Sequence, residues 1–206
     1  EGLAGKVRRL LLALFLAATS DHEHAARQYQ EIMTEDPLLF RAVGDLVVCF
    51  REREELDDMV DDYLDYARYH ERNSRLFCRI GEINANKGLL LEARDHFYHA
   101  TILDPGESRA YFCMGVLTLL RLDLPVATDF FLKAAEGRPN WSLPHLCLGL
   151  IYLEQARQRL ANVSLRRYVK LEQNPAWRES AARLIEKTSE YTRSEEHTSE
   201  LQSHSD

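Results

Sequence analysis

The sequence predicts an all-α fold, a right-handed solenoid of about five helical hairpins followed by a C-terminal capping helix. The principal observation is a pattern that occurs twice between residues 74 and 139, at an offset of 34 residues, and such self-similarity is typical of stacked helical hairpins. The two copies are Phe77, Gly81, Ala93, Phe97, Ala100 and Pro105, then Tyr111, Gly115, Ala127, Phe131, Ala134 and Pro139. Composition agrees, because 45% hydrophobic and 29% charged residues are values of a globular protein.

Each copy predicts two helices joined by a turn. Residues 74–87 and 90–103 carry apolar residues at helical spacing, with Gly88 between them. Gly81 has no side chain, so we expect the second helix to approach closely there. Pro105 ends that helix, because proline lacks an N–H and disfavours helix before it. One hairpin cannot bury its own apolar face, so neighbouring copies are expected to stack and share a core.

This pattern resembles the tetratricopeptide repeat, in which a large residue and Leu-Gly are followed by Ala-x-x-x-Phe and a terminal proline. The resemblance implies repeats at 6–37, 40–71, 74–105, 108–139 and 142–175, and we expect residues 176–192 to form the capping helix. It also implies a protein–protein interaction scaffold, which holds a peptide or helix of a partner in its concave groove. No enzymatic activity is implied.

The two N-terminal repeats are the least regular. Ala13 stands in place of the glycine of the first, and Val47 and Glu71 replace the glycine and proline of the second. Residues 6–19 have a second interpretation. Basic residues precede the apolar run from Leu10 to Ala18, as in a secretory signal peptide, although the run is too short to span a membrane.

The two ends of the chain suggest a fragment. The first residue is Glu1 rather than Met. Residues 193–206 are expected to be a disordered and non-native tail, because residues 193–204 resemble a translated sequencing adapter. The natural chain is then expected to continue beyond Thr192. The alternative is a natural disordered tail, which the lack of apolar residues also permits.

No chemistry of catalysis is predicted. The sequence contains no G-x-S-x-G, glycine-rich phosphate loop or H-E-x-x-H motif. His96 and His99 share a helix face but lack a third ligand, so neither a metal nor another cofactor is predicted.

The net charge of −7, without a basic block, argues against nucleic acid as a partner. The four cysteines form no C-x-x-C pair and are expected to be buried thiols in a reducing compartment: Cys49, Cys78, Cys113 and Cys147.

The resemblance places partner-binding residues on the first helix of each hairpin. Four of these positions predict a charged end of the groove: Arg75, Arg79, Glu82 and Arg109. Five others predict an apolar end: Phe112, Val116, Leu119, Leu146 and Leu150. The expected partner is therefore an amphipathic protein segment with acidic residues at one end and large apolar anchors at the other.

Two other functions stay open at this stage. The chain can be a docking or regulatory arm of a larger enzyme whose catalytic domain lies outside this sequence. If residues 6–19 are a signal segment, it can instead be an exported envelope assembly factor, and Asn140 and Asn162 then begin N-x-S glycosylation sequons. Without such a signal we expect a cytoplasmic protein with no membrane partner.

Overall fold

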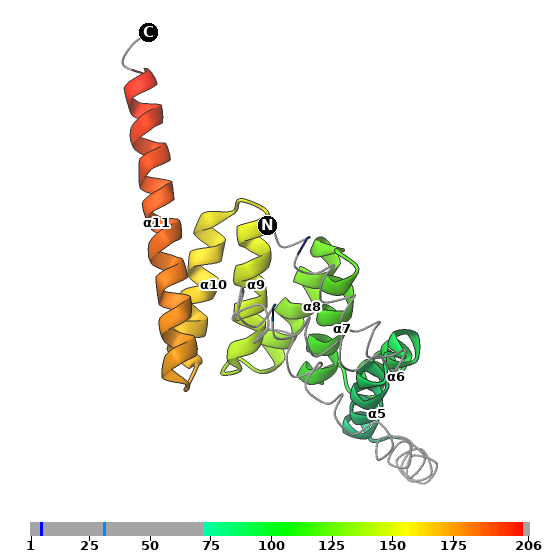
Figure 1. Ribbon diagram of the computed structural model, residues 1–206. Coiled ribbons are helices and arrows are strands. Elements are labelled where there is room, and N and C mark those ends of the chain that lie inside the picture. Colours follow the sequence, from blue (N-terminus) through cyan, green and yellow to red (C-terminus); the bar gives the residue numbers. More distant parts are fainter. Residues whose placement is uncertain (1–4, 6–30, 32–71, 204–206) are drawn as a thin grey trace. The chain divides into compact units, whose positions relative to one another are not determined.

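The computed structural model describes residues 5, 31 and 72–203, and the chain divides into two units after Pro139 (Figure 1). The N-terminal unit contains α5 (Ser74–Asn86), α6 (Leu90–Leu103), α7 (Ser108–Leu120) and α8 (Leu124–Gly137). The C-terminal unit contains α9 (Ser142–Glu154), α10 (Gln158–Leu171) and α11 (Pro175–Ser203). The described part has no strand, which confirms the predicted all-α class. The first two expected repeats and the signal-like segment lie outside the described residues.

The helices follow the 34-residue period. First helices begin at Ser74, Ser108 and Ser142, and second helices begin at Leu90, Leu124 and Gln158. Each first helix packs against the second helix that follows it, as α5 with α6, α7 with α8, and α9 with α10. These three pairs are the hairpins that the sequence pattern predicts.

The turn inside each hairpin repeats with the same period. Gly88, Leu122 and Ala156 have φ values of 78°, 60° and 55°. Each turn is closed by a hydrogen bond from the next N–H to a carbonyl five residues earlier, such as Asp123 N to Thr118 O at 3.1 Å. This is the Schellman helix ending, whose left-handed residue is usually glycine. Leu122 and Ala156 adopt that conformation with a side chain, which is unfavourable for L-residues.

The interior of each hairpin depends on a close approach at its glycine. A Cβ atom placed on Gly81 would lie 2.6 Å from Phe97 Cε1, and one on Gly115 would lie 2.7 Å from Phe131 Cε1. The third hairpin has the same contact between Gly149 and Leu165 Cδ2, at 2.6 Å. Phe97, Phe131 and Leu165 are fully buried. The predicted close approach of the two helices is therefore confirmed in all three described hairpins.

The last helix is longer than the sequence predicts. Helix α11 runs from Pro175 to Ser203, whereas we expected a capping helix to end at residue 192 and disorder to follow. The physical reason is that no glycine or proline occurs after Pro175 to end the helix. Residues 204–206 lie outside the described residues. None of the described helices is long and apolar enough to cross a bilayer.

Side-chain hydrogen bonds join α11 to α10. The Thr188 hydroxyl donates to Asn162 Oδ1 at 2.9 Å, and Asn162 Nδ2 donates to Ser189 Oγ at 3.4 Å. The oxygen and the nitrogen of the Asn162 amide thus both form hydrogen bonds inside the C-terminal unit. A glycan on the sequon that begins at this residue would disrupt these bonds.

Candidate functional site

The N-terminal unit contains a charged cavity of about 490 Å³. Helix α5, the segment that leads into α7, and the end of α8 form its walls. The lining residues are Arg75, Cys78, Arg79, Glu82, Asp104, Gly106, Glu107, Ser108, Arg109, Gly137 and Arg138. The structure therefore brings together all four residues predicted for the charged end of the groove.

Glu82 lies at the centre of this charge cluster. Its side chain is only 9% exposed and accepts hydrogen bonds from two guanidinium groups. Arg79 Nη1 donates to Glu82 Oε2 at 2.9 Å, and Arg109 Nε donates to Oε1. Since Glu82 belongs to α5 and Arg109 to α7, this contact joins two successive hairpins. Charge-assisted bonds to both oxygens satisfy a carboxylate that would otherwise be costly to bury.

The electrostatics of Arg109 follow from the same contact. Partial burial lowers the pKa of the guanidinium, but the hydrogen bond and the negative charge of Glu82 outweigh it, so the pKa is raised above its ordinary value. Arg109 is therefore held in its charged form. The cluster of Arg79, Glu82 and Arg109 carries one net positive charge.

The other two carboxylates of the cavity, Asp104 and Glu107, accept hydrogen bonds from nearby residues of the N-terminal unit. Asp104 Oδ1 accepts a hydrogen bond from the N–H of Gly106 at 2.9 Å. Glu107 Oε1 accepts one from the N–H of Arg109 at 3.3 Å, and its Oε2 accepts one from Ser74 Oγ at 3.5 Å. Glu107 thus caps the start of α7, where an acidic side chain suits the helix dipole.

Arginines outnumber carboxylates in the cavity. Four of the lining residues are arginines and three are acidic. Arg75 is exposed and forms no ion pair or hydrogen bond through its side chain to any residue in the described ranges. The cavity consequently has a surplus of positive charge, with an accessible guanidinium that is available to a negatively charged group.

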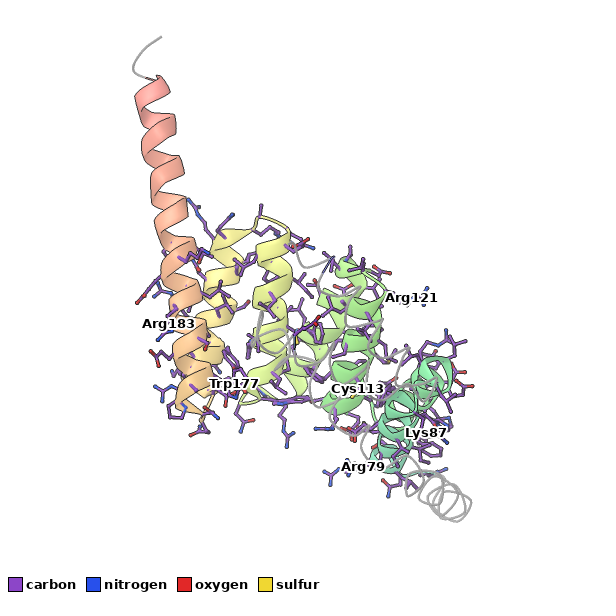
Figure 2. The ribbon with its side chains drawn as sticks, in the orientation of Figure 1. Arg79, Lys87, Cys113, Arg121, Trp177 and Arg183 are labelled. Carbon is purple, nitrogen blue, oxygen red and sulfur yellow. The ribbon has the colours of Figure 1, made fainter. Side chains whose placement is uncertain are left out.

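Two thiols lie against each other beside the charge cluster. Cys78 lines the cavity from α5, and Cys113 lies on the neighbouring first helix, α7 (Figure 2). A hydrogen bond with Cys78, and then burial, raise the pKa of the Cys113 thiol well above its ordinary value. Burial also raises the pKa of Cys147. All three cysteines of the described part are buried, as predicted, and they form no disulfide with one another, whereas Cys49 lies outside the described residues.

The apolar end of the expected groove is not exposed. Phe112, Val116 and Leu119 are 3%, 1% and 1% exposed, Leu146 is buried, and Leu150 is half-buried. Helix α7 packs against α5, α6 and α8, which explains why its apolar side chains are covered on several sides. The Phe112 ring lies 5.6 Å from that of Phe131 within the same hairpin. Phe112, Val116, Leu119 and Leu146 form core in place of the predicted open surface, and Leu150 is partly covered.

The histidine pair has an aromatic neighbour. The Phe77 ring centroid lies 4.3 Å from that of His99 and 6.3 Å from that of His96. The described residues contain no group of three His, Cys, Asp or Glu side chains placed to hold a metal ion.

Sequence reasoning missed the cavity residues that lie between hairpins. Asp104, Glu107 and Arg138 belong to the segments that follow the second helices, whereas the prediction considered first-helix positions alone. The sequence does contain a signal for these residues, because the end of each 34-residue unit leads directly into the first helix of the next unit. Charged residues around the closing prolines are therefore candidates for the same surface.

Comparison with known proteins supports the fold. No protein-family model matches the chain, and a search of curated proteins finds no match. Among solved structures, the crystal structure of MamA matches with a TM-score of 0.53 and 16% identity, over 71% of this chain and 94% of that one. A structure of PilF from Pseudomonas aeruginosa matches with a TM-score of 0.56 and 16% identity, over 91% and 89%.

Both proteins contain tetratricopeptide repeats. At this identity the likeness shows the fold alone, and it agrees with the 34-residue spacing of the helices. The chain has the fold that its repeat pattern predicts, an all-α helical-repeat solenoid of tetratricopeptide-repeat type.

Proposed function

We propose that the protein is an interaction scaffold that binds an acidic segment of a partner polypeptide in the charged cavity. The observation that carries this proposal is the surplus of arginine there, together with the exposed Arg75, which makes no ion pair with any described residue. The fold is consistent with this role, since repeat solenoids provide extended binding surfaces.

The cavity favours carboxylates for a physical reason. Guanidinium groups match carboxylate oxygens with two parallel hydrogen bonds, and this geometry gives Arg–carboxylate contacts their strength. Arg79 and Arg109 are oriented by Glu82, so less side-chain entropy is lost when they contact a ligand. The Asp104 and Glu107 carboxylates are bonded to backbone N–H groups, which reduces their repulsion of an incoming acid.

The proposed partner is simpler than the amphipathic segment expected from the sequence. Phe112, Val116, Leu119 and Leu146 are buried, so they offer no pocket to large apolar anchors in the described structure. Recognition in the cavity therefore depends on charge and hydrogen bonding.

Fluorescence anisotropy with a labelled acidic peptide tests the proposal. The probe is the capped peptide SDEEDS, and the matched neutral peptide SNQQNS has the same shape without the charges. We expect saturable binding of the acidic peptide only, weakening as salt rises, because exposed charges are screened over about 10 Å at 0.1 M ionic strength. Arg75→Glu should weaken it by about tenfold or more, as expected when a charge-assisted hydrogen bond is replaced by repulsion.

The control variant is Arg178→Glu. Arg178 is exposed on α11 and forms no side-chain ion pair with any described residue, so its reversal changes the net charge by the same amount at another place. Equal weakening by the two variants would mean that the peptide responds to net charge alone. That result, or equal binding of the two peptides, would refute the proposal.

A further inference from the structure

A second cavity lies in the N-terminal unit, between α6 and the hairpin of α7 and α8. Its volume is about 200 Å³, below the roughly 300–1,000 Å³ of typical small-molecule sites. Six apolar residues supply most of its lining: Leu90, Leu91, Met114, Leu117, Leu120 and Phe130. A cavity of this size and character suits one large side chain.

The described lining of this cavity offers little polar competition to an apolar ligand. Among the described residues its one neutral polar side chain is Thr118, whose hydroxyl donates to the carbonyl oxygen of Met114 in its own helix. Leu91 is 64% exposed at the rim. An apolar group that entered the cavity would cover Leu91 and remove this surface from water.

Two arginines stand at the rim, and one of them is already paired with a carboxylate. Arg94 donates to Asp95 at 2.7 Å and is thereby held on the surface of α6. Arg121 stands at the end of α7 and makes no ion pair with any described residue (Figure 2). A ligand that matches the apolar lining and the arginines at the rim would have an apolar side chain with a carboxylate close to it.

We infer that this cavity is a second docking site, which takes a leucine- or phenylalanine-sized side chain of a partner polypeptide that has an Asp or Glu beside it. Arg121 pairs with that acid, and the apolar walls hold the anchor. The site is independent of the charged cavity, with which it shares no residue. A partner with both features can therefore bind the N-terminal unit at two places, which raises its avidity.

Methionine methyl NMR on the full chain tests the inference. Of the chain's three methionines, Met114 is the one that lies in the described part and lines the cavity, so its methyl signal is the reporter. The probe is the capped peptide SELFES. The peptide SKLFKS keeps the anchors and reverses the charges, and SEAAES keeps the charges and removes the anchors.

We expect SELFES to shift the Met114 methyl signal saturably. SKLFKS should bind about fivefold more weakly, as is typical for lost charge complementarity at an exposed site. SEAAES should leave the signal unchanged, because truncation of a buried anchor costs tenfold or more.

Substitutions at exposed residues locate the binding without unfolding the chain. Leu91→Ser and Arg121→Glu should each weaken SELFES about fivefold or more, while Leu132→Ser, at a leucine 40% exposed on α8 outside the cavity, should have no effect. The inference is overturned if SELFES and SKLFKS bind equally, if the two cavity variants bind like the parent, or if Met114 does not respond. A Met114 shift that depends on protein concentration without peptide would also overturn it, since the occupant would then be a second copy.

Discussion

The Gly115→Leu substitution tests the packing on which each hairpin depends. A Cβ atom on Gly115 would lie 2.7, 2.8 and 3.0 Å from three carbons of the Phe131 ring, whereas carbon atoms pack at about 3.5–4.0 Å. Phe131 is fully buried, so a shift of its ring must displace closely packed neighbours. We expect overpacking to cost about 1–3 kcal/mol, offset by less than about 1 kcal/mol from the better helix propensity of leucine.

A double-mutant cycle in urea measures this contact directly. Phe131→Ala removes the ring that the new side chain would meet, so Gly115→Leu should be less destabilising in that background than in the parent. The coupling free energy should be about 1 kcal/mol or more in favour of the double variant, within the range found for residues in contact. Gly106→Ala is the control, because its Cβ would approach only the Asp104 carboxylate, at 3.2 Å.

An unfolding midpoint for Gly115→Leu equal to that of the parent would show that α8 does not approach α7 at this glycine. A coupling free energy near zero would lead to the same conclusion.

Three further predictions concern the turn, the histidine pair and the core. Ala156→Gly should stabilise the protein against urea by up to about 1 kcal/mol, because it relieves a left-handed conformation, and Gly88→Ala should destabilise it by a similar amount. Burial, followed by the charge of His99, lowers the pKa of His96, so the unfolded state binds a proton more readily than the folded state. The free energy of unfolding should therefore fall as the pH decreases through about 6.5. His96→Gln should reduce this pH dependence, measured by urea titrations at several pH values. Phe112→Ala should lower the free energy of unfolding in urea by about 3–5 kcal/mol, because Phe112 is buried. Fluorescence anisotropy should show an unchanged affinity of the folded protein for the acidic peptide.

The sequence predicted local packing better than it predicted the site. The contact of Gly115 with Phe131 lies within one 34-residue unit, so glycine, alanine and aromatic positions at the right spacing were sufficient. The bond between Arg109 and Glu82 joins two hairpins and depends on how one stacks on the next. The repeat pattern identified both residues as members of one surface but could not predict their pairing.

The tail shows a second limit of sequence reasoning. Disorder was predicted for residues 193–206 because this segment is polar and poor in apolar residues. Such composition lowers the gain from burial, but it does not prevent a helix from continuing when no residue breaks it. The absence of glycine and proline after Pro175 was therefore the more informative feature for the backbone of 193–203.

Equivalent repeat positions differ in exposure, and this explains why the apolar half of the groove was wrongly predicted. Arg79, Cys113 and Cys147 occupy the same position in three successive repeats, yet the Arg79 side chain is 57% exposed and the two cysteines are buried. A position in the repeat predicts the direction of a side chain, but neighbouring helices decide whether solvent reaches it. Because burying an unpaired charge is costly and burying an apolar group is favourable, the residue type itself carries that information. In this chain, arginines at groove positions lie at open surface, the one carboxylate buried there, Glu82, is paired with two of them, and most apolar residues at such positions form core.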